Sequence, residues 1–325
     1  MRVIAVATPA FALPTLDALA EAADVALAGL ITNPDRPRGR GLAPGPTPAK
    51  EWAIAHGVRV YTTDKLTADP TQGQMELADC LPIFALVVVA SGLFIPKWLR
   101  EKNAGYSLHG AVNLHPSLLP KWRGPAPIAW TIIGGDEVGG VTTMSLVKEL
   151  DAGPIYLQKE TAIEPRETAG SLGEKLARLG AKLVLETLRG LKAGTLDAAP
   201  QDEAKATIAP KITAELRAVD WSRSAIELER LVRGLYPDAP ARASLRGDVF
   251  QILAAEPKRT EARERPGTII AVDEAGVVVA CGEGALRLTR VKPAGRGEMT
   301  AHAFALGRRL AVGDRFDEGK RRDDS

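Results

Sequence analysis

The run at residues 84–90, FALVVVA, constrains the fold of this chain more than any other segment. It has the length of a strand and no polar position, which is typical of a central parallel strand covered on both faces. Strand-like and helical segments alternate through the first two thirds of the chain, which predicts a Rossmann-like, doubly wound parallel sheet with right-handed crossovers. Further strands are expected at 3–7, 25–31, 58–61, 110–115 and 141–147, and helices at 11–23, 48–56 and 168–190.

The composition changes after about residue 200 and indicates a second domain. Residues 197–211 resemble a polar linker, and a helix is expected at 222–235 with Ser222 as its N-cap. Five short β-like runs then predict a small β-barrel, in one interpretation of the oligonucleotide-binding (OB) type. These runs lie at 241–245, 249–254, 267–272, 276–281 and 285–291. We therefore expect a Rossmann-like catalytic domain at 1–204 and a β-barrel domain at 205–325.

Bulk properties place few limits on function. A net charge of +2 neither requires nor excludes a polyanionic partner. Cys80 and Cys281 lie far apart and outside any C-x-x-C, which favours two buried thiols in a reducing compartment over zinc or redox chemistry. The sequence shows no signal-peptide pattern, no apolar stretch of about 20 residues and no obvious assembly signal. We expect a cytoplasmic monomer without membrane contact.

The segment at 113–120, NLHPSLLP, is the strongest candidate for chemistry. Asn113 and His115 share one face at the C-terminal end of a predicted strand, where open α/β sheets place ligand crevices. Asp151 follows the next predicted strand, and a parallel neighbour would bring its carboxylate close to His115. A histidine near a strand end is usually structural, however, and such a trio serves hydrolysis, acyl transfer or metal binding equally well.

Missing motifs narrow these alternatives. The chain has no H-E-x-x-H and no second histidine or cysteine at ligand spacing, so no metal is expected. It has no G-x-S-x-G elbow and no phosphate loop. The first β–α turn, at residues 7–11, lacks G-x-G-x-x-G, so a nicotinamide dinucleotide is not expected. These absences favour direct acyl transfer.

The twelve positions at 113–124, NLHPSLLPKWRG, resemble the signature of the folate-dependent formyltransferases. Other segments are similar to one branch of that family, the methionyl-tRNA formyltransferases. These segments are 8–14, 34–41, 220–222 and the β-rich C-terminal third. The chain departs from the family pattern at Ala7, where glycine is common, and at Ser91, where tyrosine is expected.

The resemblance implies an enzyme in which Asn113, His115 and Asp151 are catalytic. The co-substrate would be 10-formyltetrahydrofolate, and the acceptor would be the α-amine of initiator methionyl-tRNA, for translation initiation. Asn113 and a ring N–H of His115 would donate to the oxyanion of a tetrahedral intermediate. Asp151 would orient His115, favour its protonated form and help to take the proton from the amine.

The resemblance also implies where folate and RNA bind. One wall of the folate pocket would be Ser117, Leu118, Leu119 and Pro120, and the other Ala90, Gly92, Leu93 and Ile95. Leu118 and Leu119 are alternatively ordinary core residues, and Arg123 either binds an anionic group or caps a helix. The loop at 33–41, fixed by prolines, would present Arg36, Arg38 and Arg40 to the tRNA. Solvated surface charge is the usual alternative for such a loop.

Phosphate contacts are also expected from the C-terminal domain. The candidates are Arg223, Arg233, Arg287, Arg290, Lys292 and Arg296. Three rival functions stay open: an amino-sugar nucleotide N-formyltransferase, a 10-formyltetrahydrofolate hydrolase, and a non-catalytic RNA-binding protein that keeps the formyltransferase core.

Overall fold

The computed structural model describes residues 1–38, 43–103, 105–260 and 264–317. The chain divides into two compact units. Unit 1 comprises residues 1–127, 138–162 and 173–209, and unit 2 comprises residues 128–137, 163–172 and 210–325.

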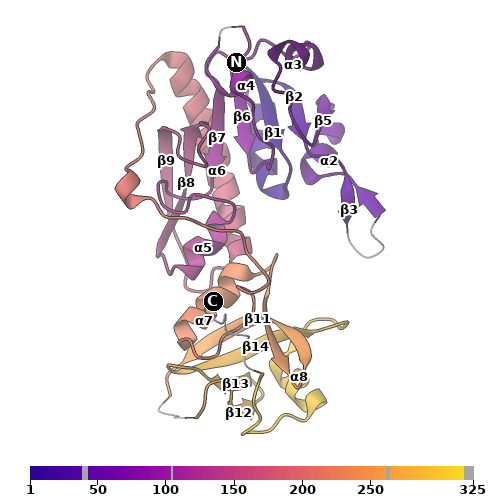
Figure 1. Ribbon diagram of the computed structural model, residues 1–325, viewed down its shortest axis with the longest axis vertical. Helices are drawn as coiled ribbons and strands as arrows, with labels where there is room; N and C mark the ends of the chain where they lie inside the picture. Colours follow the sequence, from indigo (N-terminus) through magenta and orange to yellow (C-terminus); the bar gives the residue numbers. More distant parts are fainter. Residues whose placement is uncertain (39–42, 104, 261–263, 318–325) are drawn as a thin grey trace. The chain divides into compact units, whose positions relative to one another are not determined.

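Unit 1 contains a seven-stranded sheet with the order β5-β2-β1-β6-β7-β8-β9 (Figure 1). The apolar run predicted as a central strand is β6, which is buried at all five positions between β1 and β7. Strands β5, β2, β1, β6 and β7 are parallel, which confirms the Rossmann-like prediction. The strands are β1 Arg2–Ala7, β2 Ala26–Thr32, β5 Val60–Thr62, β6 Ala85–Val89, β7 Ala111–His115, β8 Val138–Ser145 and β9 Ile155–Ala162.

At one edge of this sheet the expectation of parallel strands is wrong. Strand β8 runs antiparallel to β7, and β9, which the sequence did not indicate, runs antiparallel to β8. Only residues 146–154 join β8 to β9. A parallel crossover needs a dozen or more residues, so this connection permits only a hairpin. Asp151 therefore lies in a hairpin loop and not at the end of a parallel strand.

Helix α6, Ala169–Ala193, lies against one face of the sheet. A Cβ atom at Gly180 would lie 2.5 Å from Leu114 Cδ2, so the absent side chain allows the helix to approach β7. The other face carries a core cluster that includes Leu86, Val88 and Ala111. Because side chains alternate along β7, Asn113 and His115 lie on this second face, away from α6. The other helices of unit 1 are η1 Ala10–Ala12, α1 Leu13–Glu21, α2 Pro48–Ala55, α3 Pro70–Glu76, α4 Lys97–Arg100 and η2 Glu203–Lys205. Helix α5, Pro127–Ile133, belongs to unit 2 from residue 128 on.

The basic segment after β2 is a short hairpin, where an irregular loop was expected. Strand β3, Arg36–Arg38, pairs with β4, Ala43–Gly45, in antiparallel register. Since β2 is parallel to β1, β6 and β7, this hairpin follows β2 at the sheet edge where β7 ends in His115.

Unit 2 contains a six-stranded antiparallel sheet with the order β10-β11-β14-β13-β12, in which β15 pairs with β14. All five predicted strands are present, consistent with the predicted small barrel. They are β10 Ala241–Leu245, β11 Asp248–Lys258, β12 Ile269–Asp273, β13 Gly276–Ala280 and β14 Ala285–Pro293, and the added β15 is Met299–Thr300. Two helices, α7 Ala225–Leu235 and α8 Ala301–Arg308, accompany the sheet.

The N-cap of α7 is Ser224, and the prediction of Ser222 is wrong. The hydroxyl of Ser224 accepts a hydrogen bond from the backbone N–H of Glu227, whose carboxylate accepts one from the N–H of Ser224. This reciprocal capping box requires a glutamate three residues after the cap, which Ser222 lacks. The Ser222 hydroxyl instead donates to Asp220.

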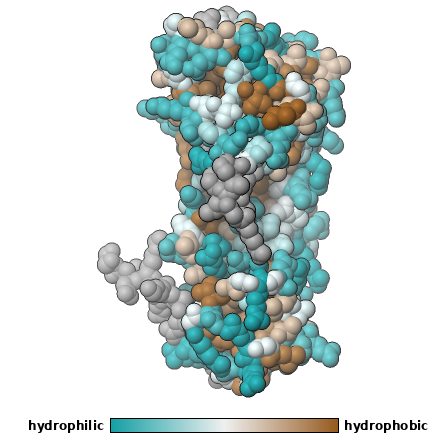
Figure 2. All heavy atoms as spheres, turned by 90° about the vertical axis from the view of Figure 1, so that its right-hand side faces the viewer, coloured by the Kyte–Doolittle hydropathy of each residue, from teal (hydrophilic) through white to brown (hydrophobic). Residues whose placement is uncertain are grey.

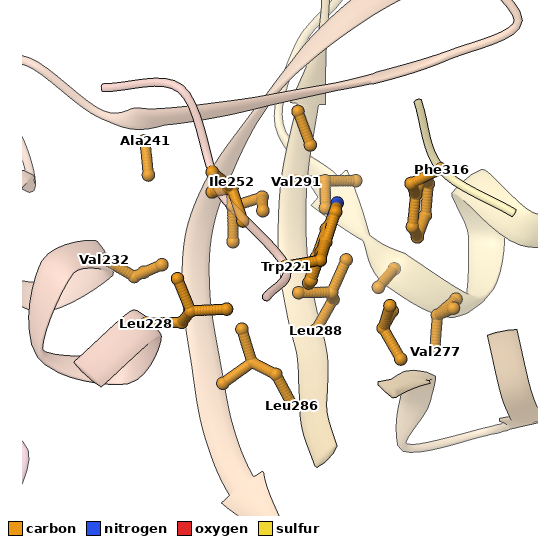
Figure 3. Close-up of a cluster of buried hydrophobic side chains, with 14 of the residues drawn as sticks. Trp221, Leu228, Val232, Ala241, Ile252, Val277, Leu286, Leu288, Val291 and Phe316 are labelled. Carbon is orange, nitrogen blue, oxygen red and sulfur yellow. The ribbon is translucent and has the colours of Figure 1, made fainter. Parts of the chain in front are cut away.

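The core of unit 2 combines aliphatic residues from α7 and the sheet with aromatic rings (Figure 3). The rings of Trp221 and Phe316 stack with their centroids 5.5 Å apart, and the ring centroids of Phe250 and Phe304 are 4.9 Å apart. Both cysteines of the chain are buried and free. Figure 2 shows mostly hydrophilic residues on the face drawn, with smaller groups of hydrophobic ones. Among the described helices, none is long and apolar enough to cross a membrane.

Candidate functional site

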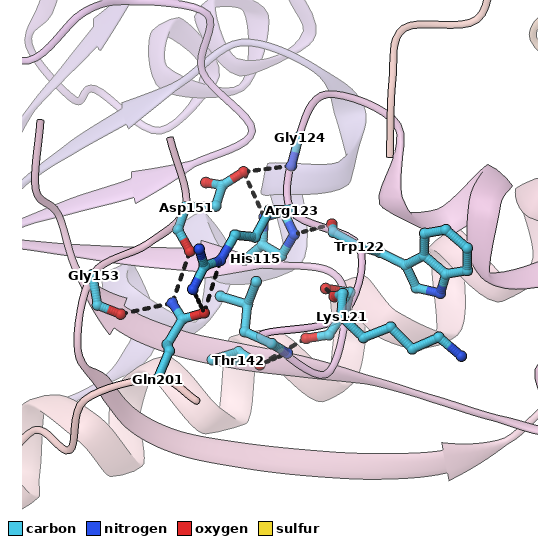
Figure 4. A network of polar contacts seen from close by, with 11 residues as sticks. His115, Lys121, Trp122, Arg123, Gly124, Thr142, Asp151, Gly153 and Gln201 are labelled. Carbon is cyan, nitrogen blue, oxygen red and sulfur yellow. Dashed lines mark hydrogen bonds and ion pairs between the residues drawn. The ribbon is translucent and has the colours of Figure 1, made fainter. Parts of the chain in front are cut away.

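The structure brings the three predicted catalytic residues together at the edge of the unit 1 sheet where its parallel strands have their C-terminal ends. Asn113 and His115 lie at the C-terminal end of β7 and are 8% and 5% exposed. The loop after β8 brings Asp151 to the same place, with its Oδ2 atom 3.7 Å from His115 Nδ1 (Figure 4). The same carboxylate oxygen accepts a 2.8 Å hydrogen bond from the backbone N–H of Gly124. The expected proximity thus exists, although the loop and not a parallel strand produces it.

Burial and hydrogen bonding together define the state of His115. Its Nε2 atom lies 3.0 Å from the carbonyl oxygen of Trp122, which can only accept, so Nε2 carries the hydrogen. Nδ1 then faces Asp151 with a lone pair when the ring is neutral. Burial lowers the pKa of His115, and the Asp151 charge and the Trp122 hydrogen bond oppose this shift. Burial is the larger effect, so the pKa of His115 lies below its ordinary value although Asp151, as expected, favours the protonated ring.

Asn113 supplies the donor that His115 does not. The ring N–H of His115 is committed to Trp122, whereas the Asn113 amide has no hydrogen bond to any described residue. Its position is set by β7, since Asn113 pairs with Val88 of β6 and Met144 of β8. The Asn113 amide is therefore free to donate to an oxygen that develops negative charge beside it.

Hydrogen bonds from side chains to backbone groups hold the loop that follows β7. The hydroxyl of Thr142 accepts from Leu119 N–H at 3.1 Å and donates to the carbonyl of Ser117 at 2.7 Å. Gln158 Nε2 donates to the carbonyl of Leu119 and to Thr142 Oγ1, and the Ser117 hydroxyl donates to the carbonyl of Lys121. Leu119 is buried and Leu118 is half-buried. The loop is therefore fixed independently of any ligand.

A buried arginine connects this loop to residues far along the chain (Figure 4). Arg123 is 7% exposed and donates through Nε and Nη2 to Gln201 Oε1, at 3.0 and 2.8 Å. It also forms a salt bridge with Glu203 at 2.8 Å, and this contact lowers the pKa of the Glu203 carboxyl. Of its two expected roles Arg123 thus has the first, because it binds an anionic group, the Glu203 carboxylate of the same chain. Its charge is neutralised within the protein, and these contacts hold residues 201–203 against the loop that follows β7.

Gln201 transmits this contact to Asp151. Its Nε2 atom donates to the backbone carbonyls of Asp151 at 2.7 Å and of Gly153 at 2.8 Å. The sequence did not indicate Gln201, because residues 197–211 resembled a linker. In the structure the segment is paired with unit 1, where Arg123 N–H donates to the Thr207 carbonyl and Ala209 N–H to the Arg123 carbonyl. The only sequence signal was an amide between Pro200 and Asp202, which has low specificity.

Three residues at this edge adopt left-handed backbone conformations without being glycine. They are Ala90, Trp122 and Asp151, with φ angles of 47°, 65° and 50°. Such conformations cost roughly 1–3 kcal/mol each and persist only where the surroundings impose them. The Gln201 contacts to the Asp151 region are an example of such an imposed geometry.

The predicted second wall of the folate pocket follows β6. Parallel pairing of Val89 with Leu114 places Ala90 level with His115 at the same edge. Ala90 and Gly92 are exposed, whereas Leu93 and Ile95 are 7% and 5% exposed and belong to the core cluster. Of the four predicted residues, only Ala90 and Gly92 therefore present accessible surface.

The three arginines predicted to contact tRNA are described only in part. Arg36 is exposed and lies 3.5 Å from Asp64. Arg38 is the last residue of β3, and Arg40 lies outside the described residues. Within the part of the chain that the structure describes, no three His, Cys, Asp or Glu side chains group as metal ligands do. The absence of a metal stays a prediction.

Comparisons with known proteins place both parts of the chain. A family model described as formyl transferase matches residues 1–188, and one described as formyl transferase, C-terminal domain matches residues 211–309. The methionyl-tRNA formyltransferase of Solibacter usitatus is 38% identical over 98% of this chain and 99% of its own length. The protein of the same name from Halorhodospira halophila is 42% identical over 96% of this chain and 98% of its own length.

Solved structures show the same fold at lower identity. HypX from Aquifex aeolicus, in complex with tetrahydrofolic acid, has a TM-score of 0.60 at 18% identity over 99% of this chain and 51% of its own. An N-formyltransferase from Helicobacter canadensis, in complex with folinic acid and dTDP-3-aminofucose, has a TM-score of 0.62 at 13% identity. It covers 90% of this chain and 98% of its own.

Proposed function

The chain belongs to the formyltransferase family, and from this premise we propose that it transfers the formyl group of 10-formyltetrahydrofolate to the α-amine of initiator methionyl-tRNA. The observation that carries the proposal is the meeting of Asn113, His115 and Asp151 at one sheet edge beside an exposed loop segment. The acceptor is supported by relatives named methionyl-tRNA formyltransferase that match nearly the whole chain, including unit 2.

Asn113 acts on the oxyanion. The neutral amine of the aminoacyl ester attacks the formyl carbon, and the carbonyl π electrons move to oxygen. The Asn113 amide, which no described residue engages, donates to this oxygen as its charge develops. Because the amide is held by β7 before the reaction, it needs no reorganisation when the charge appears.

His115 and Asp151 handle the proton. The attacking nitrogen becomes cationic and loses a proton to Nδ1 of the neutral His115 ring, beside the Asp151 carboxylate. The resulting imidazolium is stabilised by the Asp151 carboxylate 3.7 Å away and by the Trp122 carbonyl. Collapse of the intermediate re-forms C=O and breaks the bond from carbon to N10 of the folate, and N10 takes up the proton. The amine is itself the nucleophile, so no covalent enzyme intermediate is required.

In this proposal unit 1 binds the folate and both units contact the tRNA. The loop with Ser117, Leu118, Leu119 and Pro120, with Ala90 and Gly92 opposite, contacts the folate, and Leu93 and Ile95 support that wall from the core. Arg36, Arg38 and Arg40 contact the tRNA from the β3–β4 segment. Residues 1–204 form the catalytic domain, against which residues 205–209 pair with the backbone around Arg123, and residues 205–325 form the tRNA-binding domain. The enzyme acts as a cytoplasmic monomer without a metal, in the compartment where its acceptor is made.

The experiment is a formyl-transfer assay with 10-formyltetrahydrofolate and three acceptors in parallel: methionyl-tRNA, amino-sugar nucleotides and water. We expect formyl-methionyl-tRNA as the main product, with little donor consumption in the absence of tRNA. A faster rate on an amino sugar, or donor turnover without acceptor, would replace the proposed acceptor. Tight tRNA binding without any transfer would indicate a non-catalytic RNA-binding protein.

A further inference from the structure

A row of polar side chains crosses the outer face of the unit 2 sheet. Arg242 of β10 lies opposite Gln251 of β11, and Gln251 lies opposite Lys292 of β14. The residues on either side of each of them along its strand are buried in the core. Alternation therefore places all three side chains on the opposite face. Strands lie about 4.8 Å apart, so the two cations lie on either side of Gln251 within about 10 Å.

This row lines a small open cavity of about 200 Å³. The rest of the lining comes from Val249 and Phe250 of β11 and from Pro293, Ala294 and Gly295 at the end of β14. No carboxylate is part of it. Pockets for organic cofactors are usually larger, about 300–1,000 Å³, so the volume suits a single small anionic group.

The charge balance separates Arg242 and Lys292 from four of the unit 2 cations that were predicted to contact phosphate. Four of the cations predicted to contact phosphate have acidic partners: Arg223 with Glu227, Arg233 with Glu229, Arg287 with Asp273, and Arg290 with Glu298. Arg242 and Lys292 form no ion pair with any residue that the structure describes. Their positive charge is left for an external anion.

A third cation reinforces this excess. The carbonyl of Arg217 accepts a hydrogen bond from Arg242 N–H at 2.6 Å, and the Arg217 guanidinium donates to the Pro240 carbonyl at 3.1 Å. Burial, and then the charge of Arg242, lowers the pKa of Arg217. Two guanidinium groups are thus held close enough to repel, and no described acid lies between them. An anion bound here would relieve that repulsion.

We propose that Arg242, Gln251 and Lys292 form a binding site for a backbone phosphate of RNA. The Arg242 fork and the Lys292 ammonium supply charge-assisted donors, and the Gln251 amide supplies a neutral donor between them. Contacts of this kind position an RNA without reading its sequence. The identity of the RNA as the tRNA acceptor rests on the proposed function, whereas the phosphate site does not.

The test measures tRNA binding by the full-length chain against salt concentration, for wild type and for Lys292→Gln and Arg242→Gln. Each variant removes one phosphate contact, so the slope of log K against log salt decreases by about 1 and binding at 0.1 M salt weakens roughly five- to tenfold. The KM for methionyl-tRNA rises by the same factor, and kcat does not change. Arg308→Gln is the matched control, because Arg308 is an exposed unit 2 cation that pairs with Asp248; we expect a change below about twofold.

The outcomes are distinguishable. Unchanged affinity in both Lys292→Gln and Arg242→Gln overturns the site, as does an equal loss in Arg308→Gln, which would indicate diffuse charge. Lys292 is exposed, so its variant tests the site even where Arg242→Gln fails to fold. Thermal stabilisation by inorganic phosphate that Lys292→Gln abolishes, with tRNA binding intact, would assign the site to a free anion. Wild-type chain that binds tRNA in this way but does not formylate it would refute the proposed function and leave the site standing.

Discussion

Arg123 in unit 1 and Arg242 in unit 2 show two opposite uses of a guanidinium group. Arg123 is buried and is satisfied by Gln201 and Glu203, so its charge holds two segments of chain together. Arg242 lies beside a cavity with Lys292 and has no described acidic partner. An internally neutralised cation fixes geometry, whereas an unneutralised one is available to a ligand. The unit 1 site should therefore respond to substitution through kcat, and the unit 2 row through binding.

The largest effect is expected where the unit 1 geometry carries chemistry. His115→Ala removes the proton acceptor, and Asp151→Asn removes the carboxylate that stabilises the resulting imidazolium, so we expect kcat to fall on the order of 10³-fold or more in either variant. Donor affinity, measured by calorimetry, and tRNA affinity stay within a few-fold of wild type, because neither the folate walls nor the cation row changes. If either variant turned over substrate as fast as wild type, the unit 1 site would not be catalytic.

Asn113→Ala tests the oxyanion donor. Removal of one such donor typically costs about 10²–10³ in kcat, and we expect a loss in that range from single-turnover kinetics. Asn113→Asp has nearly the same shape but places a negative charge beside the oxyanion, so its loss is expected to be greater. If the two variants were equally active, or Asp the better, donation by this amide would be refuted.

Gln201→Glu tests whether Gln201 positions Asp151 for catalysis. The substitution retains an acceptor for Arg123 and removes the donors to the carbonyls of Asp151 and Gly153. We expect a kcat loss of roughly tenfold, at the low end for residues that orient a catalytic group, with an unchanged KM for tRNA. Glu203→Gln is the control: it alters the exposed partner of Arg123 and leaves Gln201 intact. If Gln201→Glu lowered the stability of the protein but left kcat per folded molecule unchanged, Gln201 would stabilise the fold without positioning Asp151.

The smallest effect is a shift in pH dependence. His115 must be neutral to accept a proton, and burial lowers its pKa, so the ring is expected to titrate at a midpoint below 6.5. Asp151 opposes that shift, so Asp151→Asn is expected to move the His115 midpoint further down. NMR titration of the His115 ring measures the midpoint in wild type and in Asp151→Asn, and the His115→Ala variant identifies its signal. An upward shift in Asp151→Asn would mean that the carboxylate is not the partner of this histidine.

Much of the fold follows from patterns visible in the sequence. The apolar run of β6 and the alternation along β7 place Asn113 and His115 at the C-terminal sheet edge, because both depend only on side-chain periodicity. The five strands of unit 2 follow from short apolar runs between turn residues. These signals are local, so a single chain reveals them.

The features that were missed depend on contacts between distant residues. The β8–β9 hairpin puts Asp151 in a loop, and neither its antiparallel direction nor the position of the carboxylate has a periodic signal. Gln201 holds the Asp151 loop through two backbone carbonyls, and Arg242 is distinguished by having no acidic partner among the described residues. Charge counts treat Arg123 and Arg242 alike, and only their surroundings distinguish them.

The pairing of residues 201–209 with the loop around Arg123 has a consequence for how the protein matures during synthesis. The ribosome delivers the chain from the N-terminus, and domains generally fold as they emerge. All seven strands of the unit 1 sheet are present once residue 162 has emerged, but Gln201 and Thr207 follow only after the whole of α6. A nascent chain therefore completes its sheet well before it can hold Asp151 in place. Any truncated version of the catalytic unit must extend past residue 209 to be active.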